Sequence, residues 1–190
     1  MSTDYAIRDS SAAGYPELVD PRGALASAVE HTQVVRDAGQ QVKTFGIVTH
    51  GSWRSWDLFR ERLEHHLANG EGGLQSVRYQ DEHPHPAERY DEIARSVDVA
   101  VLGLGNCGSC TNKVATATAE LAARGLPVIV AVTAGFHTLA VKTLEFRKQG
   151  HVPVFVLPAA YEVMTDDEIY GIADERVAEL EATLLELASQ

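Results

Sequence analysis

Short apolar runs alternate along this chain with longer segments in which apolar residues recur every three or four positions. Four of the short runs are rich in apolar and β-branched residues, which predicts strands at residues 42–49, 98–102, 127–133 and 152–157. Residues 74–79 predict a shorter, more polar strand that suits an edge of the sheet. The helical spacing predicts helices at residues 56–67, 86–97, 111–124 and 133–148. The stretch Thr165-Asp166-Asp167-Glu168 has the form of a capping box and predicts the start of a last helix.

Strand and helix alternate five times, which predicts an α/β fold. We expect a three-layer, doubly wound, five-stranded parallel sheet of the flavodoxin-like or Rossmann-like kind. Ligands bind such sheets where the strand order reverses, beyond the carboxyl ends of the strands. The order 2-1-3-4-5 makes the first and third strands neighbours at that point, so we prefer it to 3-2-1-4-5. We expect a single α/β domain over residues 23–190, with a helix at residues 24–38, after a polar arm at residues 1–22.

The third predicted strand runs into Gly103-Leu104-Gly105-Asn106-Cys107-Gly108-Ser109-Cys110-Thr111, which holds both cysteines of the chain. A helix is expected to begin there, and a helix N-terminus offers unpaired N–H groups and partial positive charge. A thiolate in that position has a lowered pKa and is nucleophilic at neutral pH. Cys107 is the better nucleophile candidate, and Cys110 is close enough in sequence to resolve a mixed disulfide.

Three loops are expected to meet at the carboxyl edge of the sheet and to bring further candidate residues with them. His50 is the candidate acid or base beside Cys107 and Cys110, with an ordinary hydrogen-bonded loop histidine as the alternative reading. The candidate substrate-binding residues are Gly51, Ser52, Trp53, Asn106, Gly108, Ser109, Thr111, Lys113, Thr133, Phe136 and His137.

Other interpretations of the cysteine pair remain open at this stage. The two thiols fit a packed, inert pair, or half of a zinc site, although no second Cys pair exists and no histidine has finger-like spacing. The glycines at 103, 105 and 108 match a short dinucleotide-binding pattern. That reading is rejected because the residues about twenty positions on form an apolar strand instead of supplying an acid. The sequence requires no cofactor and no metal.

Composition narrows the classes of partner. The chain has 190 residues, a formal net charge of −11 and a 45% hydrophobic share, as in an ordinary globular protein. The acidic balance argues against nucleic acid and against anionic membrane surfaces. With no membrane-length apolar run, no signal-peptide pattern and only two cysteines, we expect a cytoplasmic protein. We also expect a homodimer, in which the arm and the last helix pack on a second copy.

The stretch Gly105-Asn106-Cys107-Gly108-Ser109-Cys110-Thr111 resembles the UGSC family, which is named for selenocysteine-Gly-Ser-Cys. The resemblance extends more loosely to residues 18–21, 132–140 and 158–169. A fainter similarity is to selenoprotein B of glycine reductase. The resemblance implies thiol or selenol chemistry at Cys107, with Cys110 as its partner.

Three functions are compatible with these observations. The first is a thiol-dependent enzyme that uses the pair for redox or nucleophilic chemistry on a small molecule, with an external thiol as electron donor. The second is a non-redox lyase or isomerase, in which one thiolate attacks or removes a proton while the other thiol donates one. The third is a non-catalytic binding or assembly subunit.

Overall fold

The computed structural model describes residues 41–70, 74–81 and 87–189. All of them belong to a unit that spans residues 31–190. The arm expected at residues 1–22 and the helix expected at residues 24–38 lie outside the described residues.

The described strands form one parallel sheet whose order is β2-β1-β3-β4-β5. The predicted order 2-1-3-4-5 is therefore confirmed, and the alternative 3-2-1-4-5 is excluded. The strands are β1 (Thr44–His50), β2 (Gln75–Asp81), β3 (Val99–Gly105), β4 (Val128–Thr133) and β5 (Val154–Leu157). Each lies within two residues of its predicted limits except β3, which continues three residues further, to Gly105.

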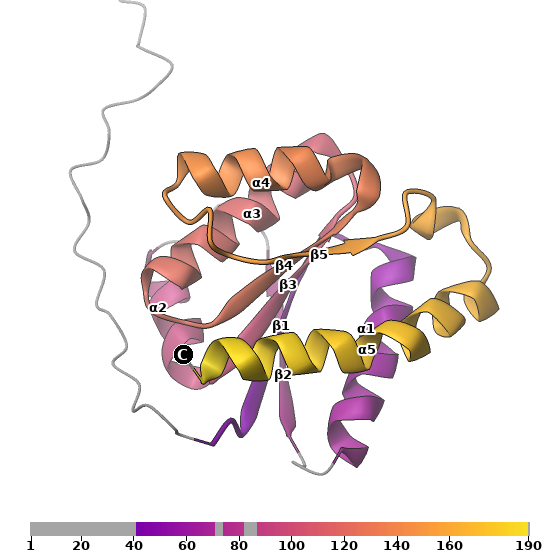
Figure 1. The fold of residues 1–190 in the computed structure, drawn as a ribbon, viewed down its shortest axis with the longest axis horizontal. Helices are drawn as coiled ribbons and strands as arrows, with labels where there is room; N and C mark the ends of the chain where they lie inside the picture. The colour runs from indigo at the N-terminus through magenta and orange to yellow at the C-terminus, as the bar shows by residue number, and fades with distance from the viewer. Residues whose placement is uncertain (1–40, 71–73, 82–86, 190) are drawn as a thin grey trace, which may run out of the picture. The chain divides into compact units, whose positions relative to one another are not determined.

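Helices connect the strands and lie on both faces of the sheet (Figure 1). The described helices are α1 (Arg54–Asn69), α2 (Ala87–Ser96), α3 (Gly108–Ala123), α4 (His137–Phe146) and α5 (Asp166–Ala188), with short 3-10 turns η2 (Ala134–Phe136) and η3 (Tyr161–Val163). The α/β class and its three layers are thus as predicted. None of the helices in these ranges is long and apolar enough to cross a membrane.

Two hydrophobic cores, one on each face, hold the layers together. The first joins β1, β3, β4 and β5 to α1 and α5 and contains Trp56, Phe59 and Leu180. The second joins the opposite face to α2, α3 and α4 and contains Leu102, Leu121 and Leu144. All seven residues of β3 are buried, as expected for a central parallel strand covered on both faces.

The capping box predicted before the last helix is present. The Thr165 hydroxyl accepts a hydrogen bond from the Glu168 N–H, and the Glu168 carboxylate accepts one from the Thr165 N–H. It starts α5, which buries Ile169, Ala173, Val177 and others against the first core. The helix α3 is followed by Gly125, whose positive φ of 80° suits glycine and lets the chain turn into β4.

Candidate functional site

Three strand ends define the candidate site. The strands β1, β3 and β4 end at His50, Gly105 and Thr133, and β3 lies between the other two in the sheet. The loops that follow them therefore leave the same edge side by side. The pairing of β3 with β4 shifts register between Leu102 and Gly105, just before the cysteine loop. Such irregularities redirect a strand end, and they are common beside functional sites.

Gly105 lets the start of α3 approach the sheet. A β-carbon at this position would lie 2.8 Å from Val132 Cγ1 and 2.9 Å from Thr111 Oγ1. Both distances are shorter than real β-carbons show, so any side chain here would push α3 away from β4. The glycine therefore fixes where Cys107 and the first turn of α3 lie.

Cys107 occupies the N-cap position of α3. Its Sγ accepts a hydrogen bond from the Cys110 N–H at 3.2 Å, the bond that a serine or aspartate oxygen makes at other helix starts. The two Sγ atoms lie 2.6 Å apart, and Ser109 Oγ lies 3.4 Å from Cys107 Sγ. Both cysteines are free thiols and half-buried. The first turn of α3 thus brings the two sulfurs into direct contact without any movement of the sheet.

The surroundings shift the pKa values of the two thiols in opposite directions. Partial burial raises the pKa of Cys107, but hydrogen bonds from the Cys110 thiol, the Ser109 hydroxyl and two backbone N–H groups outweigh it, so that pKa lies below its ordinary value. Burial, together with the hydrogen bond and the negative charge of Cys107, raises the pKa of Cys110, and the charge of Lys113 opposes that rise only in part. The first thiol to ionise is therefore Cys107, while Cys110 keeps its proton.

Asn106 connects the cysteine loop to the neighbouring strand. Its Oδ1 accepts a hydrogen bond of 2.9 Å from the hydroxyl of Thr133, the fully buried last residue of β4. Thr111, in the first turn of α3, is also fully buried, and its Oγ1 makes no hydrogen bond in the described part of the chain. Asn106 and Thr111 thus both lie where the cysteine loop meets β4, and the substrate-binding role expected of them stays a prediction.

The first loop carries His50, Gly51, Ser52 and Trp53. His50 is 8% exposed and follows Thr49, the last residue of β1 that pairs with β3. Gly51 has a positive φ of 76°, Ser52 is exposed, and Trp53 is half-buried and packs against the first core. The first loop thus lies beside the end of β3, with His50 largely enclosed at its start.

The remaining candidates lie at the starts of the helices that follow β3 and β4. Gly108, Ser109 and Lys113 are exposed on the first turns of α3. On the β4 side, Phe136 is half-buried and His137 is exposed at the start of α4. Across the described residues His137 makes no hydrogen bond to either cysteine. The role proposed for it as substrate ligand stays a prediction, as does that of His50 as acid or base.

Sequence reasoning missed Glu162, which closes the N-terminus of α1. Its carboxylate accepts hydrogen bonds from the N–H groups of Arg54 and Ser55, at 3.1 and 3.0 Å, and from the Ser55 hydroxyl at 2.6 Å. The Arg54 guanidinium in turn contacts Asp166 and the Met164 carbonyl. No local sequence signal announces this cap, because Glu162 lies 108 residues after Arg54. The N–H groups at the start of α1 are thus bound by a carboxylate of the same chain, whereas the N-cap of α3 is a cysteine.

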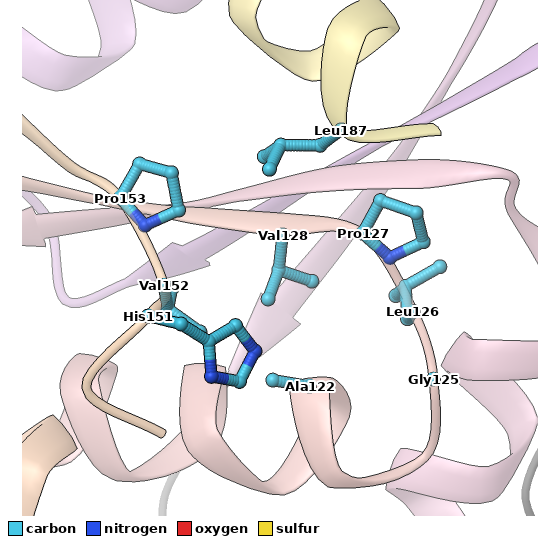
Figure 2. A pocket seen from close by; sticks show the side chains of 9 residues that line it. All are labelled: Ala122, Gly125, Leu126, Pro127, Val128, His151, Val152, Pro153 and Leu187. Atoms are coloured by element: carbon cyan, nitrogen blue, oxygen red, sulfur yellow. The ribbon is translucent and has the colours of Figure 1, made fainter. Parts of the chain in front are cut away.

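A pocket of about 230 Å³ lies at the opposite edge of the sheet, away from the cysteines. It is formed where β4 and β5 begin, and Val128 lies between Leu187 of α5 and Ala122 of α3 (Figure 2). His151 is its one titratable lining residue. We do not assign the candidate chemistry to this pocket, because neither thiol lines it and its lining side chains other than His151 are apolar.

The donor set for a metal is incomplete in the part of the chain that the structure describes. Across residues 41–70, 74–81 and 87–189, no three His, Cys, Asp or Glu side chains lie close enough together to hold a metal ion. Cys107 and Cys110 supply two ligands, whereas structural zinc takes four and catalytic zinc usually three.

Comparison with solved structures gives distant matches. A flavo di-iron protein from Thermotoga maritima is 15% identical, with a TM-score of 0.49, over 74% of this chain and 35% of that chain. A diflavin flavoprotein from Nostoc sp. is 11% identical, with a TM-score of 0.49, over 77% of this chain and 96% of that chain. The chain thus spans about a third of the first of these proteins. No match is found among curated proteins.

A family comparison gives a match over most of the chain. The family model of the UGSC family matches residues 17–186, a range that includes all of the described strands, the cysteine loop and nearly all of α5. The match agrees with the resemblance carried by residues 105–111. The chain belongs to the UGSC family.

Proposed function

We propose that this protein is a thiol-dependent enzyme in which Cys107 attacks a small molecule and Cys110 then resolves the covalent intermediate formed on Cys107. The observation that carries the proposal is the pair itself: two free thiols in contact at the start of α3. The pKa of Cys107 is lowered and that of Cys110 is raised, which assigns attack to the first and proton retention to the second. Such a pair must be kept reduced between cycles, which is the reason for our proposal of the cytoplasm.

The proposed redox cycle uses a substrate disulfide, or another sulfur electrophile with a thiol leaving group. The Cys107 thiolate forms a bond to one substrate sulfur as the substrate S–S bond breaks, and the other half leaves as a thiolate. Cys110 then loses its proton and attacks Cys107 Sγ, releasing the second half. The substrate disulfide has become two thiols and the protein dithiol one disulfide. An external thiol returns the pair to the dithiol by the same two exchanges in reverse.

A non-redox alternative is favoured by the same opposite pKa directions. A thiolate beside a thiol is a base beside an acid, which is what proton transfer in an isomerase or elimination in a lyase requires. In that case Cys107 removes a proton while Cys110 donates one, and no disulfide forms during turnover. The two proposals differ in whether the sulfurs become bonded to each other.

Exchange with a small disulfide tests the redox proposal. We expect 4,4′-dithiodipyridine to react first at Cys107 and to release one thiopyridone, after which Cys110 displaces a second one. Intact-mass measurement should then show no pyridyl adduct and the loss of two thiol hydrogens. The Cys110→Ser variant should stop after the first release and retain one adduct. A native chain that carries a separate adduct on each cysteine would rule out the redox cycle and leave the acid–base alternative.

A further inference from the structure

The side chain of Lys113 lies on the same face of α3 as the thiol pair. Cys110 and Lys113 are three residues apart in this helix, and residues at that spacing are neighbours on a helix surface, with β-carbons about 5–6 Å apart. Cys110 Sγ in turn contacts Cys107 Sγ. The positive charge of Lys113 acts on Cys110, where it opposes the rise in the pKa of that thiol. The ammonium group therefore lies within electrostatic range of the thiol pair.

The fold does not use the charge of Lys113 elsewhere. Lys113 is exposed, and its side chain makes no ion pair and no hydrogen bond within the described residues, whereas Lys142 on α4 pairs with Glu145. A lysine side chain ends in three donors on a flexible four-carbon stem. The ammonium group of Lys113 is therefore available to an anionic group on a molecule that reaches the thiols.

Carboxylates are scarce around the thiol pair, although the chain as a whole is acidic. Of the 27 Asp and Glu residues, only Glu120 lies between residues 99 and 144, a range that holds β3, α3, β4 and most of α4. Glu120 is far from the start of α3 and pairs with Arg124 and Arg147. The loops after β3 and β4 thus present the charge of Lys113 without a carboxylate of their own that would repel an anion.

We propose that the disulfide or other sulfur electrophile attacked by Cys107 is negatively charged, and that Lys113 pairs with its anionic group during the attack. Opposite charge beside a reacting group raises the local concentration of substrate and the rate of encounter. Lys113 is thus a specificity-determining residue, and cationic disulfides are poor substrates. The inference rests on the proposed redox cycle and adds the charge of the molecule that enters it.

Three small disulfides of different charge serve as probes. Near neutral pH, 5,5′-dithiobis(2-nitrobenzoate) carries a carboxylate on each half, 4,4′-dithiodipyridine is neutral, and cystamine carries an ammonium on each half. In each case the Cys107 thiolate bonds to one probe sulfur as the probe S–S bond breaks, and the other half leaves as a thiolate. Cys110 then loses its proton and displaces the second half, so that the probe becomes two thiols and the protein dithiol one disulfide. The ratio of a charged to the neutral probe, compared between variants, cancels changes in thiolate reactivity.

The test compares these ratios in the full native chain and in three variants at low salt. Lys113→Gln should lower the nitrobenzoate ratio about threefold and raise the cystamine ratio, because one exposed pair of opposite charges contributes about that much. Both changes should shrink as salt is added, since exposed charges are screened. Lys113→Arg should keep both ratios near the native values. Lys43→Gln makes the same change in net charge just before β1, at the opposite edge of the sheet, and should leave the ratios unchanged.

Two results would overturn this inference without touching the proposed function. Equal ratios in the native chain and in Lys113→Gln would show that Lys113 binds no anionic group of the substrate. An equal fall in Lys113→Gln and Lys43→Gln would show that only the net charge of the chain matters. Failure of the proposed redox cycle looks different, because the native chain would then keep a separate adduct of the neutral probe on each cysteine.

Discussion

At the scale of single residues, the site depends on a few hydrogen bonds to one sulfur atom. Cys107 Sγ accepts a hydrogen bond from the Cys110 N–H and lies within hydrogen-bond distance of the Ser109 hydroxyl and the Cys110 thiol. Each of these donors favours the thiolate over the thiol, and together they outweigh the effect of burial. Removal of any one of them should therefore move the pKa of Cys107 upwards.

Ser109→Ala tests this at one atom. Losing the hydroxyl should raise the pKa of Cys107, because a hydrogen bond to its charged form is lost. The thiolate then forms only at higher pH, so alkylation by iodoacetamide should slow at neutral pH and recover at alkaline pH. The measurement is the alkylation rate against pH, with Ser189→Ala, at the far end of α5, as control. A profile that does not move, or that moves to lower pH, would contradict the assigned hydrogen bonds.

At the scale of elements, the cap of α1 comes from the other end of the chain. Glu162 joins η3 to the first turn of α1 through two backbone N–H groups and one hydroxyl. Glu162→Ala should lower the free energy of unfolding by about 1–2 kcal/mol, the range for losing a helix cap. Urea denaturation measures it, with Glu175→Ala, exposed on α5, as the matched control. Equal stabilities of the two variants would show that the cap contributes nothing.

Two glycines should respond oppositely to alanine. A β-carbon on Gly103 would lie 2.6 Å from Cζ2 of Trp56, which is fully buried in the first core. Gly103→Ala should therefore destabilise the fold by about 1–3 kcal/mol. Gly171 lies inside α5, and apart from the adjacent backbone of its own helix no atom of the described residues lies within 4 Å of an added β-carbon, so Gly171→Ala should stabilise by about 0.5–1 kcal/mol. Thermal unfolding of both variants measures these changes, and a midpoint that shifts in the same direction in both would contradict the prediction.

The elements themselves were largely readable from the sequence. Apolar runs such as residues 127–133 are covered on both faces and stay apolar throughout, so their limits were predicted within a residue or two. The extension of β3 to Gly105 was not predicted, because glycines at 103 and 105 read as loop residues. In the fold they are strand residues. Glycine is needed at 103 because Trp56 packs against the backbone there, and at 105 because Thr111 does. The Glu162 cap could not be predicted either, since it joins residues far apart in sequence.

At the scale of the molecule, the strand order was predicted by placing the candidate site where the order reverses. The order β2-β1-β3-β4-β5 makes the loops after His50, Gly105 and Thr133 neighbours, as that reasoning required. The cysteine pair and its first helical turn were readable because the spacing is local. The Thr133–Asn106 bond and the register shift before it were not, because they depend on how β3 and β4 pair.

The homodimer remains a prediction at this scale. Light scattering of the full chain should give twice the monomer mass of 20.6 kDa. Deletion of residues 1–22 should shift the population towards monomer, because the arm is proposed to pack on a second copy. A monodisperse monomer in both preparations would remove the idea.

In the proposed function, Cys107 is the nucleophile and Cys110 is its protonated partner. The most direct test is to treat the native protein near neutral pH with a limiting amount of iodoacetamide and to locate the label by fragmenting the peptide that holds both cysteines. The opposite pKa directions predict that more of the label lies on Cys107 than on Cys110. Unfolded protein, in which the two thiols are alike, should share the label between them. A native protein labelled first on Cys110, or equally on both cysteines, would contradict the assignment of Cys107 as nucleophile.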